Sequence, residues 1–323
     1  MKIGMVLAGG GAKGAYQIGV WKALKELEID KYINIISGTS IGALNAILFM
    51  QNDLELAENM WRNITKEKIL PVNEKDLTKK GMLLALGLKN IAFIKKHMPK
   101  VIVGGNISKD GLIEIMEKID FDIIKNSNKS CYVACTEVST LMPKYFYINN
   151  KEKEDIKKIL LATSALPMIY ECEEIEYTQY LDGGIVDNLP IQPVYGEGCD
   201  LIILVHLSKG NMINKSAFPN TSIIDIVPSI IEEGVLGGTL DFTIEGAQKR
   251  IKLGYEDTIN VFSPIMNLTR FIEDSNISAK TNANISVLEK NSNSNRINKI
   301  IGNMKNVLGM CEKNNDLDNN SDI

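Results

Sequence analysis

The sequence has few residues that bind metals or form disulfides. It contains only two histidines, and its five cysteines are an odd number without a disulfide-like pattern. Cys131 and Cys135 would lie roughly 13 Å apart along one strand, which is too far for a disulfide bond. No group of histidines lies near them to complete a metal site. We therefore expect no bound metal and a reducing, cytoplasmic environment.

A basic excess and long apolar runs are also missing. The formal net charge is −4, whereas nucleic-acid-binding proteins usually carry a basic excess, so we expect no nucleic-acid partner. No apolar run is long enough to span a bilayer. The N-terminal stretch MKIGMVLAGGGAKG resembles a secretory signal in having one lysine and an apolar run, but that run is short and ends in glycines. This pattern favours a first β-strand.

Strands and helices alternate along the first part of the chain. Residues 2–8 and 32–37 have the pattern of buried strands, and each is followed by a segment with the apolar spacing of a helix. This alternation predicts an α/β fold with a largely parallel sheet and helices on both faces. Further along the chain we expect strands at 130–140, 144–150, 200–208 and 258–263, and helices at 154–167, 222–234 and 238–255.

A glycine-rich loop, Gly9-Gly10-Gly11-Ala12-Lys13-Gly14, lies between the first strand and the first helix. Its backbone N–H groups can point at an anion, helped by the helix dipole. A dinucleotide site would also need an acidic residue at the end of the second strand, but that strand ends in SGTSIG. The other anion that such a loop can bind is the oxyanion of an acyl-transfer intermediate. Lys13 is either a solvated or ion-paired lysine or a contact for a substrate phosphate.

The second motif, Gly38-Thr39-Ser40-Ile41-Gly42, follows the second strand and matches the G-x-S-x-G nucleophile elbow. Its flanking glycines permit the sharp turn that presents a serine hydroxyl at the N-terminus of the next helix. The same serine could instead be an ordinary helix N-cap. The glycine loop on the neighbouring strand favours the elbow, because the two loops would lie side by side.

Two residues could serve as the base for Ser40. Asp182, in Asp-Gly-Gly, ends an alternating strand where a catalytic carboxylate would belong, although these residues also suit an ordinary turn. His206 would complete the Ser, Asp, His order of α/β-hydrolases. In that fold, however, the elbow follows several strands, and a lone histidine at a strand end is more often structural. His97 lies in a lysine-rich segment and is expected to be solvated.

Three segments, GGGAKGAYQIGV, GTSIGALNA and DGGIVDNLP, together with ATSALPMIY, resemble the patatin-like phospholipase family over roughly residues 4–195. The resemblance implies a three-layer α/β sandwich and a lipid acyl hydrolase of the phospholipase A or lysophospholipase type. It implies a Ser–Asp dyad in which Ser40 is the nucleophile and Asp182 the base, without metal or organic cofactor. The implied supporting residues are Gly9, Gly10, Gly11, Ala12, Lys13 and Gly14 in the oxyanion hole, Gly38, Thr39, Ile41 and Gly42 in the elbow, and Gly183 and Gly184 in the base loop. Thr163 departs from the family, which usually has serine there.

Two other functions remain open. One is a soluble carboxylesterase or thioesterase with the same dyad, and the other is a catalytically silent protein that binds or regulates lipid. We expect residues 1–265 to form the hydrolase domain and residues 266–323, rich in Asn, Ser and Lys, to form a helical to flexible extension. This extension is expected to contain a helix around 280–310 and a disordered end at 312–323. Residues 81–103 are either a helix packed on the core or a cap that meets a lipid surface peripherally.

Overall fold

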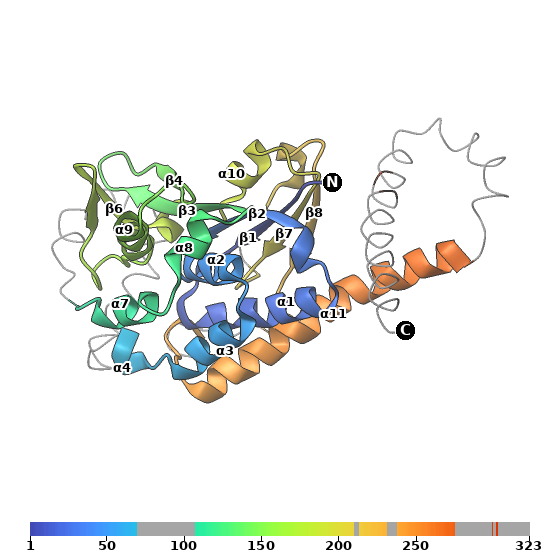
Figure 1. Cartoon of the computed structure of the whole chain (residues 1–323), viewed down its shortest axis with the longest axis horizontal. Helices are drawn as coiled ribbons and strands as arrows, with labels where there is room; N and C mark the ends of the chain where they lie inside the picture. Colours follow the sequence, from blue (N-terminus) through green and yellow to red (C-terminus); the bar gives the residue numbers. More distant parts are fainter. Residues whose placement is uncertain (70–106, 210–212, 231–237, 275–298, 300–301, 303–323) are drawn as a thin grey trace, which may run out of the picture.

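The computed structural model describes residues 1–69, 107–209, 213–230, 238–274, 299 and 302 (Figure 1). His97, the segment 81–103 and the end at 312–323 lie outside this part of the chain, as does nearly all of the helix expected at 280–310. Among the described helices, none has both the length and the apolar character needed to cross a bilayer.

One eight-stranded sheet forms the centre of the described part of the chain. Its spatial order is β5-β6-β3-β2-β1-β7-β8, and β4 pairs with β3 outside this path. The run from β3 to β8 is parallel, whereas β4, β5 and β6 pair in antiparallel fashion. The largely parallel sheet is therefore confirmed. The strands are β1 (Ile3–Leu7), β2 (Ile33–Thr39), β3 (Ser130–Glu137), β4 (Pro143–Tyr147), β5 (Glu173–Ile175), β6 (Thr178–Asp182), β7 (Leu201–Val205) and β8 (Ser222–Ile226).

Helices cover both faces of the sheet and complete the three layers (Figure 1). The α10 helix packs on one face, where Gly4 of β1 leaves room for the side chain of Val194. The α1, α2 and α11 helices lie on the other face (Figure 1). The α2 helix is apolar and almost entirely buried, since it lies between the sheet and other helices. The helices are α1 (Ala15–Glu26), α2 (Ile41–Gln51), α3 (Leu54–Asn63), α4 (Lys66–Ile69), α7 (Asp110–Met116), α8 (Phe121–Lys125), α9 (Lys153–Thr163), α10 (Ile191–Gly196) and α11 (Ile244–Asp274).

Two predictions about the last third of the chain are wrong. The helix expected at 222–234 starts instead with a strand, β8, because Ile223, Ile224 and Ile226 extend the parallel sheet beside β7. The strand expected at 258–263 is part of α11. Its β-branched residues suggested a strand, but packing of α11 along α1 outweighs that local preference.

The register of the sheet brings the sequence motifs together at the carboxyl-terminal end of its parallel strands. Leu7 of β1 pairs with Gly38 of β2, so the glycine loop and the elbow leave adjacent strands at the same level. Thr39 pairs with Ala134 of β3, and the next β3 residue, Cys135, pairs with Asp182 of β6. Because β6 runs antiparallel to β3, its last residue arrives at the level of Ser40. Asp182 and Ser40 thus flank the same strand.

Two glycines allow α1 and α11 to cross at close range. A Cβ on Gly19 would lie 1.9 Å from the carbonyl oxygen of Ile251, and one on Gly254 would lie 2.0 Å from that of Tyr16. The Tyr16 hydroxyl also donates to Asp257 Oδ2 at 3.0 Å. This contact fixes α11 to the helix that begins at the glycine loop. The α11 helix continues through residue 265, and the domain boundary expected there stays a prediction.

Substituting Gly254 by alanine should destabilise the protein, because the new Cβ would force the two helix backbones apart. Overpacking of this kind typically costs about 1–3 kcal/mol. Gly196→Ala is a matched control, since a Cβ on this α10 residue has no neighbour within 4 Å. Thermal unfolding should show a lower midpoint for Gly254→Ala and an unchanged or slightly raised midpoint for Gly196→Ala. Equal midpoints for the two variants would contradict the close crossing.

Candidate active site

Ser40 has a strained backbone at the turn between β2 and α2. Its φ of 54° and ψ of −126° are rarely adopted by residues other than glycine. Cβ atoms on Gly38 and Gly42 would lie 2.4 Å from the Gly42 backbone and 2.3 Å from the Leu7 carbonyl oxygen, so both positions require glycine. Ser40 occupies the N-cap position of α2, but its side chain makes no capping hydrogen bond. The half-buried hydroxyl is therefore not used as a helix cap.

Thr163, at the end of α9, fixes the backbone of Ser40. Its hydroxyl accepts a hydrogen bond from the Ser40 N–H at 2.9 Å and donates to the carbonyl oxygen of Ala134 at 2.5 Å. Thr163 is fully buried, so water does not compete for either bond. Threonine stands here where the resembled family usually has serine. It keeps the hydroxyl group and therefore both hydrogen bonds.

The carboxylate of Asp182 is buried and only partly hydrogen-bonded. Oδ1 accepts from the N–H of Gly184 at 2.7 Å, whereas Oδ2 has no hydrogen-bond partner among the described residues. Burial raises the pKa of Asp182 from 3.8 to about 6, and the Ser40 hydroxyl and the Gly184 N–H oppose this rise. The Ser40 hydroxyl therefore lies near the carboxylate, which keeps one oxygen without a hydrogen-bond partner among the described residues.

The glycine loop turns into the short 3₁₀ helix η1 (Gly11–Gly14) that precedes α1. The first N–H groups of such a turn lack intrahelical acceptors, and are the candidate oxyanion donors. Gly11 has a φ of 57°, and a Cβ there would lie 2.3 Å from the Thr239 carbonyl oxygen. Glycine is required at this position by both backbone conformation and space.

A chain of buried polar side chains supports both ends of the glycine loop. Trp61 Nε1 donates to Asn45 Oδ1 at 3.0 Å. Asn45 Nδ2 in turn contacts the Gly14 carbonyl oxygen at 2.9 Å and Gln17 Oε1 at 2.7 Å. Gln17 Nε2 donates to the carbonyl oxygen of Ala8 at 2.8 Å. This network holds the residues that precede and end the loop, and buried networks of this kind resist displacement when fully paired.

The segment that follows Asp182 is hydrogen-bonded to the elbow strand. Ser37 Oγ donates to the Pro190 carbonyl oxygen at 2.6 Å, and Thr39 Oγ1 donates to that of Asp187 at 2.9 Å. Gly183 lies close to β3 and to the end of β2, since a Cβ there would be 2.3 Å from the Ala134 carbonyl oxygen and 3.0 Å from Thr39 Cγ2. Ser40 and the segment after Asp182 are therefore held together as one unit.

Ser40 and Gly11 line a mostly apolar pocket with a cavity of about 50 Å³. By the usual measure for buried water, this volume holds roughly three to five water molecules. The hydroxyl of Tyr170 donates to the carbonyl oxygen of Ile69 on the same wall. The other apolar lining residues include Ile41, Leu44, Leu112, Ile115, Leu166 and Phe242. The pocket can accept an apolar group beside the serine hydroxyl.

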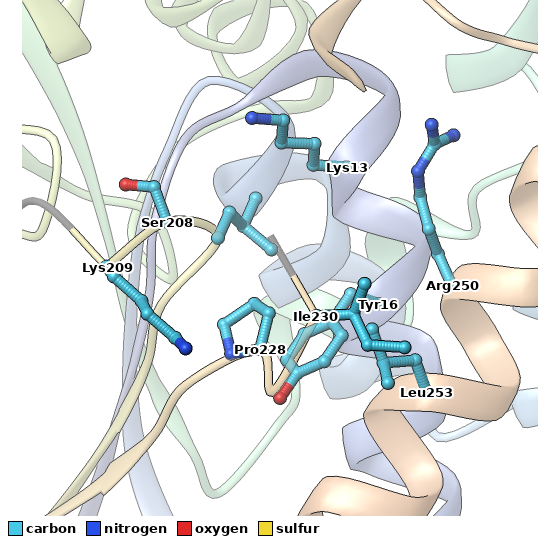
Figure 2. A pocket seen from close by; sticks show the side chains of 9 residues that line it. Lys13, Tyr16, Ser208, Lys209, Pro228, Ile230, Arg250 and Leu253 are labelled. Atoms are coloured by element: carbon cyan, nitrogen blue, oxygen red, sulfur yellow. The ribbon is translucent and has the colours of Figure 1, made fainter. Parts of the chain in front are cut away.

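Lys13 lines a second hollow, shown in Figure 2, which Ser40 does not line. Lys209 and Arg250 also border this hollow, but the three cationic groups point in different directions (Figure 2). Arg250 donates to Asp241 Oδ2 at 2.8 Å. The three cations therefore do not converge on one anion, and the role of Lys13 toward a substrate phosphate stays a prediction.

His206 has a partner away from Ser40. Its Nε2 lies 2.7 Å from Asp225 Oδ1, and Asp225 also forms an ion pair with Lys215 at 2.5 Å. His206 follows β7, and β1 separates β7 from the elbow strand β2. This placement matches the structural interpretation of the histidine. Within the described ranges, no group of three or more His, Cys, Asp or Glu residues is arranged to hold a metal ion.

In the structure, Ser40, Asp182 and the glycine loop thus lie together at the carboxyl-terminal end of the parallel strands. Sequence reasoning missed the contacts that fix them, made by Thr163 and by the buried pair Gln17 and Asn45. Thr163 lies in ATSALPMIY, so its place within a recognised motif was the available signal. Gln17 and Asn45 gave only a weak signal, as polar residues on otherwise apolar helices.

The chain is similar in sequence to several known proteins. A family model described as patatin-like phospholipase matches residues 5–195. The chain is 27% identical to lysophospholipase nte1 of Aspergillus terreus over 203 residues, which cover 63% of this chain and 12% of that protein. It is 24% identical to the uncharacterised protein YjjU of Escherichia coli over 219 residues, or 65% of this chain and 53% of that protein. The chain thus spans about an eighth and about half of these two relatives.

Solved structures of similar shape include VipD from Legionella pneumophila. The likeness has a TM-score of 0.45 at 17% identity and covers 81% of this chain and 67% of that chain. Human GIVD cytosolic phospholipase A2 gives a TM-score of 0.43 at 12% identity, with 82% and 58% covered.

Replacing Asp182 by asparagine should stabilise the folded protein above about pH 6. The folded protein binds its proton more tightly than the unfolded chain, so wild-type stability should fall as the pH rises from about 4 to 6. The difference between the pKa of Asp182 in the unfolded chain, 3.8, and in the folded protein, about 6, corresponds to about 3 kcal/mol in the free energy of unfolding. Thermal unfolding from pH 4 to 8 should show the variant more stable at pH 8, with the advantage shrinking toward pH 4. A pH-independent difference, or a less stable variant at pH 8, would contradict the buried-charge account.

Proposed function

Because the chain belongs to the patatin-like phospholipase family, we propose that it is a lipid acyl hydrolase of the phospholipase A or lysophospholipase type. The observation that carries this proposal is the buried carboxylate of Asp182 beside the strained Ser40, because no described residue forms a hydrogen bond with its Oδ2. The apolar pocket at Ser40 supports an acyl group as the substrate part bound there. The similarity to a fungal lysophospholipase points to the same substrate class.

In the proposed reaction Ser40 Oγ attacks the ester carbonyl carbon while Asp182 takes its proton. A carboxyl group with a pKa of about 6 is a better base for a hydroxyl than an exposed aspartate, and it is still ionised at neutral pH. The negative charge that develops on the former carbonyl oxygen is stabilised by N–H groups of the glycine loop. By raising its pKa, burial thus makes Asp182 a stronger base.

Collapse of the tetrahedral intermediate breaks the ester bond and leaves the acyl group on Ser40. Protonated Asp182 gives its proton to the leaving alkoxide, which departs as an alcohol, here a lysolipid or glycerol derivative. Water then attacks the acyl-enzyme, with Asp182 again as base, and the fatty acid leaves. These steps use only the chain's own residues and water.

The apolar pocket beside Ser40 would also suit a second candidate, a soluble carboxylesterase or thioesterase. The same dyad would carry out this reaction. Comparing esters of increasing acyl length in solution and in mixed lipid vesicles separates the two candidates, because the lipid hydrolase should prefer the long-chain substrate at an interface.

The proposed setting is the cytoplasm with peripheral contact to a membrane that supplies the lipid ester. The net charge of −4 does not favour anionic surfaces in general. Contact with such a surface would therefore depend on a local basic or apolar segment. From the sequence, residues 81–103 are one candidate for this segment, the alternative being a helix packed on the core.

Ser40→Ala and Asp182→Ala should each abolish ester hydrolysis, and the double variant should be little worse than either single variant. Residues that act as one unit are non-additive in this way. His206→Asn should retain substantial turnover, because its ring is paired with Asp225. The measurement is kcat/KM on a soluble ester and on phospholipid vesicles.

Circular dichroism should first establish that every variant is folded. If folded Ser40→Ala hydrolyses both substrates as fast as the wild type, the proposed function is refuted. If folded His206→Asn loses as much activity as Ser40→Ala and Asp182→Ala, a Ser–Asp–His triad replaces the dyad. A wild type that binds vesicles but is inert toward esters and phosphonate probes would indicate a catalytically silent lipid-binding protein.

A further inference from the structure

Asn188 holds Gly9 of the glycine loop at both of its backbone polar groups. The Gly9 N–H donates to the Asn188 carbonyl oxygen at 3.2 Å. The Asn188 side-chain Nδ2 donates to the Gly9 carbonyl oxygen at 3.1 Å. A carbonyl oxygen can only accept, so the amide must turn its NH₂ group toward Gly9. The side-chain oxygen then points away from that carbonyl.

The Asn188 amide also fills the space between the glycine loop and the base loop. A Cβ on Gly9 would lie 2.6 Å from Asn188 Oδ1 and 3.2 Å from Ser40 Cβ. A Cβ on Gly184 would lie 2.9 Å from Asn188 Oδ1 and 3.0 Å from Asp182 Oδ1. The two side-chain oxygens are therefore no more than 5.9 Å apart. One side chain thus borders the nucleophile, the base and the loop of candidate oxyanion donors.

We propose that Asn188 is a positioning residue for ester hydrolysis, an inference that rests on the proposed function. Its amide sets the position of the glycine loop relative to Ser40 and Asp182, so that the loop N–H groups meet the oxyanion. Donors of this kind act only at short range, and a displacement of about 1 Å can cost roughly 100-fold in rate. Asn188 itself does not touch the reacting atoms in this account.

A purely structural asparagine elsewhere in the chain provides a matched control. Asn149 Nδ2 donates to the Lys129 carbonyl oxygen at 2.7 Å, and its Oδ1 accepts from the Cys131 N–H at 2.9 Å. Like Asn188, it is half-buried and bonds to backbone groups. It lies beside the first residues of β3, at the end of the strands opposite to Ser40. Removing its amide should lower stability without disturbing the site.

The test compares wild type, Asn188→Ala, Asn188→Asp, Asn149→Ala and Ser40→Ala. For each folded protein, kcat and KM are measured on a short soluble ester, together with the second-order rate of labelling by a fluorophosphonate. For Asn188→Ala we expect kcat and the labelling rate to fall about 10-fold to 100-fold, with KM within about 2-fold of wild type. Asn149→Ala should lower the unfolding midpoint and leave kcat within about 2-fold.

Asn188→Asp keeps the size of the side chain and serves if Asn188→Ala does not fold. It turns the donor that faces the Gly9 carbonyl into an acceptor, so kcat should again fall. A second carboxylate within 5.9 Å should also raise the pKa of Asp182. The acidic limb of the pH–rate profile should therefore move to higher pH, which a change in stability alone would not produce.

The outcomes separate the two levels of the account. If wild type and Ser40→Ala are equally inert toward the ester and the phosphonate, the proposed function fails, and the inference fails with it. If wild type is active and Ser40→Ala is not, but Asn188→Ala has wild-type kcat, only the positioning role is refuted. A loss of kcat in Asn149→Ala equal to that in Asn188→Ala would likewise refute it, because both would then reflect general destabilisation.

Discussion

Desolvation of one carboxylate is the constraint on which the site depends. Asp182 is 3% exposed, and its Oδ2 has no hydrogen-bond partner within the described ranges. An ionised group in such a place destabilises the fold, and proteins normally avoid the arrangement. Here the single donor from Gly184 and the nearby Ser40 hydroxyl offset burial only in part, which leaves the pKa of Asp182 at about 6. The same imbalance that weakens the fold gives the carboxylate its basicity.

The surroundings of Ser40 are rigid because several unfavourable features must be held in place together. The left-handed backbone of Ser40 costs of order 1–3 kcal/mol, and Thr163 opposes its relaxation by binding the Ser40 N–H. Ser37 and Thr39 attach the base loop to the same strand. Most of these bonds join side chains to the backbone of a distant segment. They fix the relative positions of the loops without placing further polar side chains inside the pocket.

The sequence predicts those features that depend on local chemistry. Gly11, Gly38 and Gly42 stand where a backbone conformation or a close approach excludes any Cβ, so their motif reveals the turns directly. The contacts of Thr163 and Asn188 join segments more than 100 residues apart, and no local pattern specifies them. The raised pKa of Asp182 likewise follows from burial, which only the assembled sheet determines. For the same reason the sequence does not predict β8 or the helical conformation of residues 258–263, since tertiary packing decides both.

The central claim is that a carboxylate activates Ser40 without help from histidine. Since the chain has only two histidines, a variant carrying His97→Asn and His206→Asn tests it directly. The measurement is the rate of fluorophosphonate labelling between pH 4 and 8 for this variant, for wild type and for Asp182→Asn. The account predicts that the histidine-free protein and wild type share one acidic limb near pH 6, and that Asp182→Asn is not labelled at any pH. Loss of labelling in the folded histidine-free protein, or normal labelling of Asp182→Asn, would contradict it.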